Sequence, residues 1–202
     1  MKKMNKFVFQ SGDYLQKEKT CIQLNNDDIV YSDGTGLLTT DKDRVPVGSV
    51  EFTKQYFKYV GIREPENISY PNELRSYLHR NITVTRFVDA SPDNFVKPVE
   101  TKLFAGNIKK NLEETVNDDT LVYESKPVAF KQEFRYYVLD KQIIGYSRYD
   151  DGDDHDIIPD ERIILNMIID YTKAPIGYSI DVGVVNDQTT LIECNDACLL
   201  YT

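Results

Sequence analysis

Residues 178–195 of this chain read YSIDVGVVNDQTTLIECN, and this stretch determines the fold more than any other. Apolar and polar residues alternate on both sides of Asn186-Asp187-Gln188, which is the pattern of two antiparallel strands joined by a turn. The apolar positions of the first strand share one face: Ile180, Val182 and Val184. On the returning strand Ile192 and Cys194 share a face, so the hairpin is expected to cover a core and Cys194 to pack in it.

The opposite face of this hairpin gathers oxygen-bearing side chains. With a three-residue loop, Asp181 lies directly across from Glu193, whereas a loop of even length puts the two on opposite faces. Asn195 shares the face of Glu193, and Leu191 flanks it. Two carboxylates and an amide this close repel one another unless a cation lies between them, and Mg²⁺ prefers such oxygen ligands. The pattern therefore predicts Mg²⁺ at Asp181, Glu193 and Asn195, with a solvated polar face as the alternative.

Composition restricts the classes of function. The 202 residues include 24 Lys and Arg against 33 Asp and Glu, which gives a net charge of −9. Because an acidic protein repels a phosphate backbone, nucleic acid is not an expected partner, although a local group of bases can still hold one nucleotide. The apolar runs are too short for a signal peptide or a spanning helix. The 3 cysteines and 2 histidines form no zinc spacing, so a cytoplasmic protein without a membrane contact is expected.

Helices and strands are mixed without strict alternation, which predicts the α+β class. Helices are expected over Val50–Val60, closed by Gly61, in a short segment after Pro71, and from Pro159 to about Tyr171. Strands are expected over 29–31, 82–85, 94–98, 129–139, 142–147, 178–185 and 190–195.

Basic residues in the β-rich segments are candidates for phosphate binding. Lys97 ends an apolar strand before Pro98, and Arg135 and Arg148 lie inside strand patterns. A guanidinium that points into a fold needs an anion, and phosphate fits its fork. The alternative is that each arginine forms a surface pair with a neighbouring carboxylate.

The order and spacing of these parts resemble the ATP-grasp superfamily, and within it the small phage and bacterial branch related to peptide and ribosomal-tail amino-acid ligases. The segments that carry the resemblance are Phe95-Val96-Lys97-Pro98, Leu121–Ser125, Glu133-Phe134-Arg135, Asp181 and Glu193-x-Asn195, with 45–52 and 70–80 before them. The resemblance covers about 45–195 and implies two α+β lobes clasping a nucleotide. It implies an N-terminal region over 1–80 and the ATP-grasp lobes over 81–202.

The resemblance also implies roles for individual residues. Those implied to bind the nucleotide are Arg80, Lys97, Lys102, Tyr123, Glu124 and Glu133. Within this group, Lys102 belongs to a loop over the phosphates at 101–106, residues 122–124 read adenine through their backbone, and Glu124 or Glu133 lies near the ribose. Arg135 and Arg148 are implied to face the transferred phosphate or acyl group, and the Mg²⁺ ligands are the three residues of the hairpin.

The implied activity is a ligase that uses ATP and Mg²⁺ to activate a carboxylate as an acyl phosphate, which an amine acceptor then attacks. The acceptor could be a small molecule, a peptide or a protein tail, and the sequence does not indicate an oligomeric state. Two alternatives stay open: a non-catalytic nucleotide-binding or interaction module, and a phosphotransferase on the same fold. The acidic run at 150–156 is interpreted as a solvated loop rather than a site for Ca²⁺ or for a basic acceptor.

Overall fold

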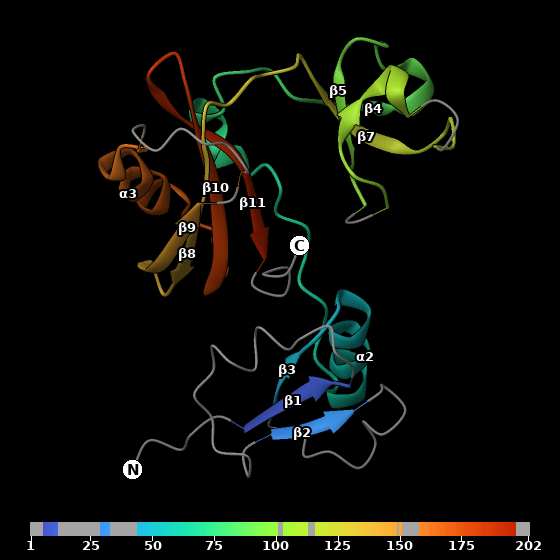
Figure 1. Cartoon of the computed structure of the whole chain (residues 1–202), viewed down its shortest axis with the longest axis vertical. Coiled ribbons are helices and arrows are strands. Elements are labelled where there is room, and N and C mark those ends of the chain that lie inside the picture. Colours follow the sequence, from blue (N-terminus) through green and yellow to red (C-terminus); the bar gives the residue numbers. More distant parts are fainter. Residues whose placement is uncertain are drawn as a thin grey trace. The chain divides into compact units, whose positions relative to one another are not determined.

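A computed structural model describes residues 6–11, 29–32, 44–100, 103–112, 116–148, 150 and 158–196 (Figure 1). These residues divide into two compact units, one ending at Glu66 and one beginning at Asn67. The stretch 67–80, expected from the sequence to belong with the N-terminal region, lies in the second unit. From the sequence, the ATP-grasp lobes are expected to begin at residue 81. That functional boundary is distinct from the division into compact units, and it stays a prediction. In the described parts of the chain, no helix has both the length and the apolar character needed to cross a membrane.

The first unit is a parallel sheet packed against one helix. Its strands are β1 (Lys6–Gln10), β2 (Ile29–Ser32) and β3 (Arg44–Val47), with β1 in the centre. Helix α2 (Val50–Val60) buries Phe52 and Tyr56 against Val8 of β1.

Helix α2 has the predicted limits because both of its ends are set locally. The Ser49 hydroxyl accepts a hydrogen bond from the Phe52 amide at 3.2 Å, which caps the first turn. Gly61 ends the helix with a φ of 79°, a left-handed conformation that glycine adopts without steric cost.

The second unit contains a four-stranded antiparallel sheet in the order β11-β10-β8-β9. Its strands are β8 (Glu133–Leu139), β9 (Gln142–Arg148), β10 (Gly177–Val185) and β11 (Gln188–Asp196). Helix α3 (Glu161–Asp170) buries Ile164, Met167 and Ile168 in a core shared with this sheet. The predicted core position of Cys194 is confirmed, because its side chain is buried in the same core.

The hairpin of β10 and β11 differs from the predicted one in its turn and in its ladder. The turn has two residues, Asn186 and Asp187, with φ values of 50° and 62°, and Val185 pairs with Gln188. An even loop alone would separate Asp181 from Glu193. The ladder, however, shifts by one residue between Asp181 and Val182, so that the pairing of Asp181 with Glu193 is restored.

The shift also changes which residue of β11 enters the core. Val182 pairs with Leu191, Asp181 pairs with Glu193, and Ile192 between them is the extra residue of a β-bulge. Leu191, expected to flank the polar face, is fully buried in the core instead, and Ile192 is only half-buried. The prediction of a regular ladder with a three-residue loop was therefore wrong, although the pairing of Asp181 with Glu193 is confirmed. The binding of Mg²⁺ at this pair stays a prediction.

A second four-stranded antiparallel sheet in this unit has the order β4-β7-β5-β6. Its strands are β4 (Thr83–Arg86), β5 (Phe95–Pro98), β6 (Asn107–Ile108) and β7 (Leu121–Ser125). Phe87, Ala90, Val96 and Val122 form its core. The described residues of this unit also form three short 3₁₀ helices: η4 (Asn72–Tyr77), which is the helix expected after Pro71, η5 (Phe87–Asp89) and η6 (Lys109–Asn111).

Candidate functional site

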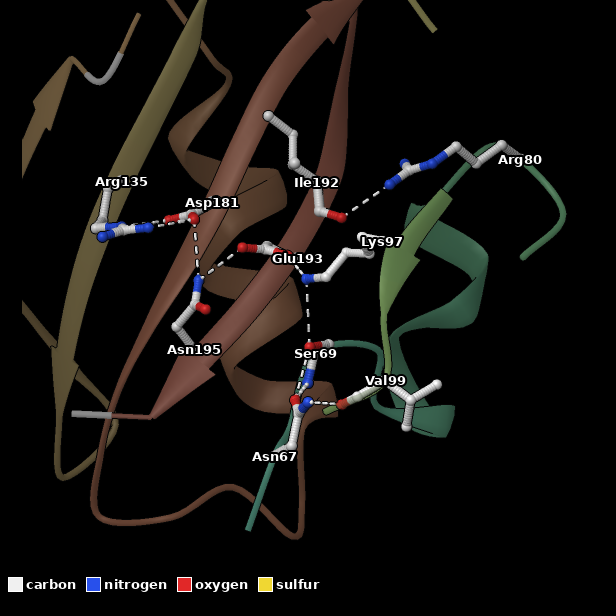
Figure 2. A network of polar contacts seen from close by, with 10 residues as sticks. All are labelled: Asn67, Ser69, Arg80, Lys97, Val99, Arg135, Asp181, Ile192, Glu193 and Asn195. Carbon is white, nitrogen blue, oxygen red and sulfur yellow. Dashed lines mark hydrogen bonds and ion pairs between the residues drawn. The ribbon is translucent and has the colours of Figure 1, made fainter. Parts of the chain in front are cut away.

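The site begins with the polar face of the β10–β11 hairpin, where the three predicted metal ligands lie together (Figure 2). Asp181 and Glu193 are paired across the two strands. The Asn195 side-chain amide donates to Asp181 Oδ2 at 3.0 Å and to Glu193 Oε1 at 3.2 Å. The structure thus gathers two carboxylates and one carboxamide on one surface.

Arg135 of β8 holds the first of these carboxylates. Its Nε and Nη2 donate to the two oxygens of Asp181, each at 2.8 Å, in a bidentate ion pair. The exposed fractions of the two side chains are only 4% and 5%. Burial raises the pKa of the Asp181 carboxyl and Glu193 adds to this effect, while Arg135 opposes it. The bidentate ion pair with Arg135, a residue of the same sheet, therefore fixes the orientation of the Asp181 carboxylate.

Lys97 holds the second carboxylate from the other sheet. It lies on β5, and its ammonium group forms an ion pair with Glu193 Oε2. The same Nζ donates to the Ser69 hydroxyl at 3.4 Å and lies 5.3 Å from the centre of the Tyr70 ring. Ser69 is held by Asn67, whose side chain also donates to the Val99 carbonyl at 2.7 Å (Figure 2). The segment 67–70 therefore connects the carboxylates to the end of β5.

Arg80 contacts the backbone of β11. Its two terminal nitrogens donate to the carbonyls of Leu191 and Ile192, each at 2.8 Å, and one also donates to the Leu78 carbonyl at 3.1 Å. Burial lowers the pKa of the guanidinium, while Tyr70 and Glu193 raise it. In this structure Arg80 is thus tied to the bulge of the hairpin.

Glu133 and Arg148 lie at the same end of the β8–β9 pair. The Glu133 amide donates to Asp150 Oδ2 at 2.7 Å, and Arg148 Nη2 donates to Asp150 Oδ1, also at 2.7 Å. Burial and the nearby carboxylates Asp181, Asp150 and Glu193 raise the pKa of the Glu133 carboxyl. The ion pair between Arg148 and Asp150 matches the alternative interpretation, in which the arginine pairs with a neighbouring carboxylate. The contact of Arg148 with a transferred phosphate or acyl group stays a prediction.

A cavity of about 590 Å³ opens beside Arg80. Its lining includes Tyr70 and Tyr123, whose rings meet edge to face with centres 4.7 Å apart, and Val84 and Asn81. The lining also includes Arg75, Arg80 and Thr83, so it combines aromatic and apolar side chains with polar ones that could orient a small molecule.

Tyr123 connects this cavity to the carboxylates, because it pairs with Lys97 across β7 and β5. Burial raises the pKa of its hydroxyl. Glu124, the next residue, accepts hydrogen bonds from the Ser91 amide at 2.7 Å and from the Asn94 side chain at 2.8 Å. Its proposed place near a ribose stays a prediction.

The predicted phosphate loop lies next to Lys97. A side-chain carbon added at Gly106 would lie 2.6 Å from the Phe95 ring and 3.1 Å from Lys97 Cβ, so glycine permits this close approach. Lys102 and Thr101 of the same loop, and most of the acidic run at 150–156, lie outside the described residues.

Sequence reasoning missed two parts of the site. Ser69 and Asn67 carry no motif, and only their position before Tyr70-Pro71 could have suggested that they lie near the basic residues. Ser179 lies two positions before Asp181, on the same face of β10, and it pairs with Asn195 across the hairpin. Its hydroxyl is buried and has no hydrogen-bond partner in the described part of the chain, so a polar group remains available beside the carboxylates.

The donor set fits Mg²⁺. Each carboxylate oxygen has two lone pairs, so Asp181 can accept from Arg135 and still offer a lone pair to a cation. No group of three or more His, Cys, Asp or Glu side chains in metal-binding geometry occurs within the described ranges. A Mg²⁺ bound here would be held by Asp181 and Glu193, and by the Asn195 carbonyl oxygen once the amide turns, because its nitrogen now donates to both carboxylates; water or phosphate oxygens would fill the other positions.

Comparisons with known proteins identify the family and the fold of the chain. A protein-family model described as "ATP-grasp domain, R2K clade family 2" matches residues 77–201. D-alanine–D-alanine ligase from Bacillus anthracis complexed with ATP is similar over 96% of this chain and 86% of its own, with 14% identity and a TM-score of 0.58. The ATP-grasp ligase PsnB complexed with a minimal precursor is similar over 71% of this chain and 58% of its own, with 15% identity and a TM-score of 0.46. No curated protein sequence matches the chain. The ATP-grasp fold of α+β class, expected from the sequence, is confirmed.

Proposed function

Because the chain belongs to the ATP-grasp domains of R2K clade family 2, we propose that it binds Mg²⁺-ATP and uses it to join a carboxylate to an amine. One observation carries this proposal: Lys97 from one sheet forms an ion pair with Glu193 of the other, and Glu193 lies directly across from Asp181. A nucleoside triphosphate with its metal needs a basic side chain for the phosphates and carboxylates for the metal, and both lie together here.

The base and ribose of the nucleotide are proposed to occupy the cavity beside Tyr123 and Arg80. The cavity of about 590 Å³ lies within the usual range for small-molecule sites, about 300–1,000 Å³. Tyr123 also lies directly across from Lys97 in the sheet, so a nucleotide in the cavity would direct its phosphates toward Lys97. Gly106 gives the loop after β5 room to approach these phosphates.

Each proposed residue acts through charge and position. Mg²⁺, when bound, neutralises phosphate oxygens and supports displacement at phosphorus. Lys97 would leave Glu193 and donate to the phosphates, which stabilises the charge on the transferring group. Asp181 would keep its direction because Arg135 holds both of its oxygens.

The proposed reaction has two displacements. A carboxylate oxygen attacks the γ-phosphorus, ADP leaves, and an acyl phosphate forms. An amine then attacks the acyl carbon, phosphate leaves, and the nitrogen loses a proton. No protein nucleophile is required, which agrees with the buried position of Cys194, the one cysteine that the structure describes.

Calorimetry with Mg²⁺-ATP tests the site, with Glu193→Gln as the variant and Asp93→Asn as the matched control. Asp93 forms an exposed ion pair with Lys110 outside the site. We expect Glu193→Gln to weaken binding by on the order of 10- to 100-fold, since it removes one ionised ligand, and Asp93→Asn to leave it unchanged. Equal binding by all three proteins would show that the site is misplaced.

The ligase activity is tested separately by ADP release with fractionated cell extract as the source of carboxylates and amines, followed by mass spectrometry of the product. A new amide would support the proposal. ADP release with a phosphorylated product and no amide would identify a phosphotransferase instead, and binding without ADP release would identify a non-catalytic module.

A further inference from the structure

The inference concerns the bulge in β11, because it decides where Glu193 lies. The two-residue turn at Asn186-Asp187 pairs Val182 with Leu191, and an unbroken ladder would then pair Asp181 with Ile192. In that ladder Glu193 would lie across from Ile180, whose side chain is fully buried in the core. The extra residue Ile192 prevents this.

The side chains on either side of the bulge show why it is needed. Leu191 and Glu193 are two positions apart, and in a regular strand they would share one face. Here Leu191 is 0% exposed in the core and Glu193 lies on the polar face beside Asp181. Only a break in the alternation between them satisfies both requirements.

Arg80 is bonded to this break. In a regular strand successive carbonyls point toward opposite neighbours, so a single side chain cannot reach two of them in a row. At the bulge the successive carbonyls of Leu191 and Ile192 both accept from the Arg80 guanidinium at 2.8 Å. β11 is the edge strand of its sheet, so these carbonyls have no further strand to bond to within that sheet.

The rest of the edge is held from the same segment of chain. Beyond the bulge the Cys194 amide donates to the Ser69 carbonyl at 2.9 Å, and Arg80 is itself fixed by the Leu78 carbonyl at 3.1 Å. Figure 2 shows Arg80 reaching the Ile192 carbonyl on the same side of the strand as Lys97.

We propose that Arg80 is a positioning residue that holds the Ile192 bulge closed and thereby keeps Glu193 beside Asp181. Its effect on metal binding rests on the proposed function, whereas its effect on the strand does not. This role differs from a direct phosphate contact, because three of the five N–H donors of the guanidinium already bond to backbone carbonyls.

The test uses a deletion that removes the need for the bulge. Without Ile192, the two-residue turn pairs Asp181 with Glu193 in an unbroken ladder and leaves Leu191 and Cys194 facing the core. An arginine whose role is to hold the bulge therefore becomes dispensable in that background. An arginine whose role is to bind phosphate would still be needed in that background.

The first measurement is the labelling rate of the Cys194 thiol in a full-length protein carrying Cys21→Ser and Cys198→Ser. Cys194 is 1% exposed, so its labelling reports opening of β11. We expect Arg80→Met to speed labelling by on the order of 100-fold, because two charge-assisted hydrogen bonds to the strand are lost. Deleting Ile192 from that variant is expected to restore the protection.

The matched control is Arg75→Met, which removes an exposed arginine from the lining of the cavity beside Arg80 and is expected to leave Cys194 protected.

The second measurement is the binding of Mn²⁺ alone. Binding is expected to weaken in Arg80→Met and to recover in the variant that also lacks Ile192. If Arg80→Met leaves Cys194 protected, or if the deletion fails to restore protection, the proposal is wrong. If the labelling behaves as expected while the unaltered protein binds neither Mn²⁺ nor Mg²⁺-ATP, the proposed function fails and the role of Arg80 in the strand stands.

Discussion

Two ion pairs lie side by side on the polar face of the hairpin, and they are built differently. Asp181 is bound at both oxygens by an arginine of the same sheet, with side chains 4% and 5% exposed. Glu193 is bound by a lysine from the other sheet, with side chains 19% and 20% exposed. The first pair has a fixed geometry and little access to water. In the second pair the cation is a lysine ammonium, a point charge on a flexible side chain that water can reach.

The difference suggests a division of labour between the two carboxylates. A buried bidentate pair is costly to break because a lone charge remains in the interior. A half-buried lysine can exchange one anion for another, since water solvates both groups during the exchange. We infer that Asp181 provides a fixed ligand and that Lys97 moves from Glu193 to a phosphate when a nucleotide binds.

The largest expected effect comes from breaking the buried pair. Arg135→Met leaves Asp181 charged without its partner, and we expect the free energy of unfolding to fall by about 3–5 kcal/mol, measured by urea denaturation. Combining it with Asp181→Leu should recover most of this loss, because no buried charge is then left alone. A loss below about 1 kcal/mol in Arg135→Met would contradict the comparison, since that is the value of an ordinary surface pair.

Lys97→Met is expected to act on binding rather than on stability. It removes the cation proposed for the phosphates, so the affinity for Mg²⁺-ATP should fall by on the order of 10- to 100-fold in calorimetry. The free energy of unfolding should change by less than about 1 kcal/mol, because Glu193 remains accessible to water and bonded to Asn195. A stability loss as large as that of Arg135→Met would show that the two pairs are equivalent.

Gly106→Ala is expected to have a smaller effect through the position of Lys97. The added methyl group meets the Phe95 ring and Lys97 Cβ, so we expect a loss of about 1 kcal/mol in ATP binding energy, at the low end of overpacking effects. Gly145→Ala is the matched control, because its nearest neighbour, an atom of the Tyr137 ring, is 4.0 Å away. Equal ATP affinities for the two variants would mean that the loop does not need the close approach.

The smallest effect is expected at the exposed pair of Lys110 and Asp93, whose side chains are more than half exposed. Lys110→Met should leave both the urea midpoint and the affinity for Mg²⁺-ATP within experimental error. A measurable loss in either would mean that exposure does not distinguish the three pairs, and the comparison between Asp181 and Glu193 would lose its basis.

The parts of the fold that the sequence predicted well are those fixed by neighbouring residues. Helix α2 begins after a serine cap and ends at Gly61, and both signals lie within the segment itself. The strands expected over 129–139 and 142–147 leave Asp140-Lys141 between them, and the structure has the turn there, with φ values of 48° and 61°.

The parts of the site that the sequence could not predict depend on distant contacts. Lys97 and Glu193 are separated by 96 positions, and periodicity carries no information about which strands of different sheets meet. The partners of Arg80 are backbone carbonyls, which every residue has, so no pattern distinguishes them. The bulge was hidden because Ile192 and Cys194 fit an apolar alternation in the sequence, whereas the register shift and the burial of Leu191 reveal it in the structure.

The tight turn at Asn186-Asp187 has a consequence for the order in which the site assembles during folding. Contacts close in sequence form faster because less chain entropy is lost in closing the loop. Asp181 and Asn195 are 14 positions apart, Arg135 and Asp181 are 46 apart, and Lys97 and Glu193 are 96 apart. We therefore expect the carboxylates to meet each other first, to acquire their arginine next, and to receive the lysine last.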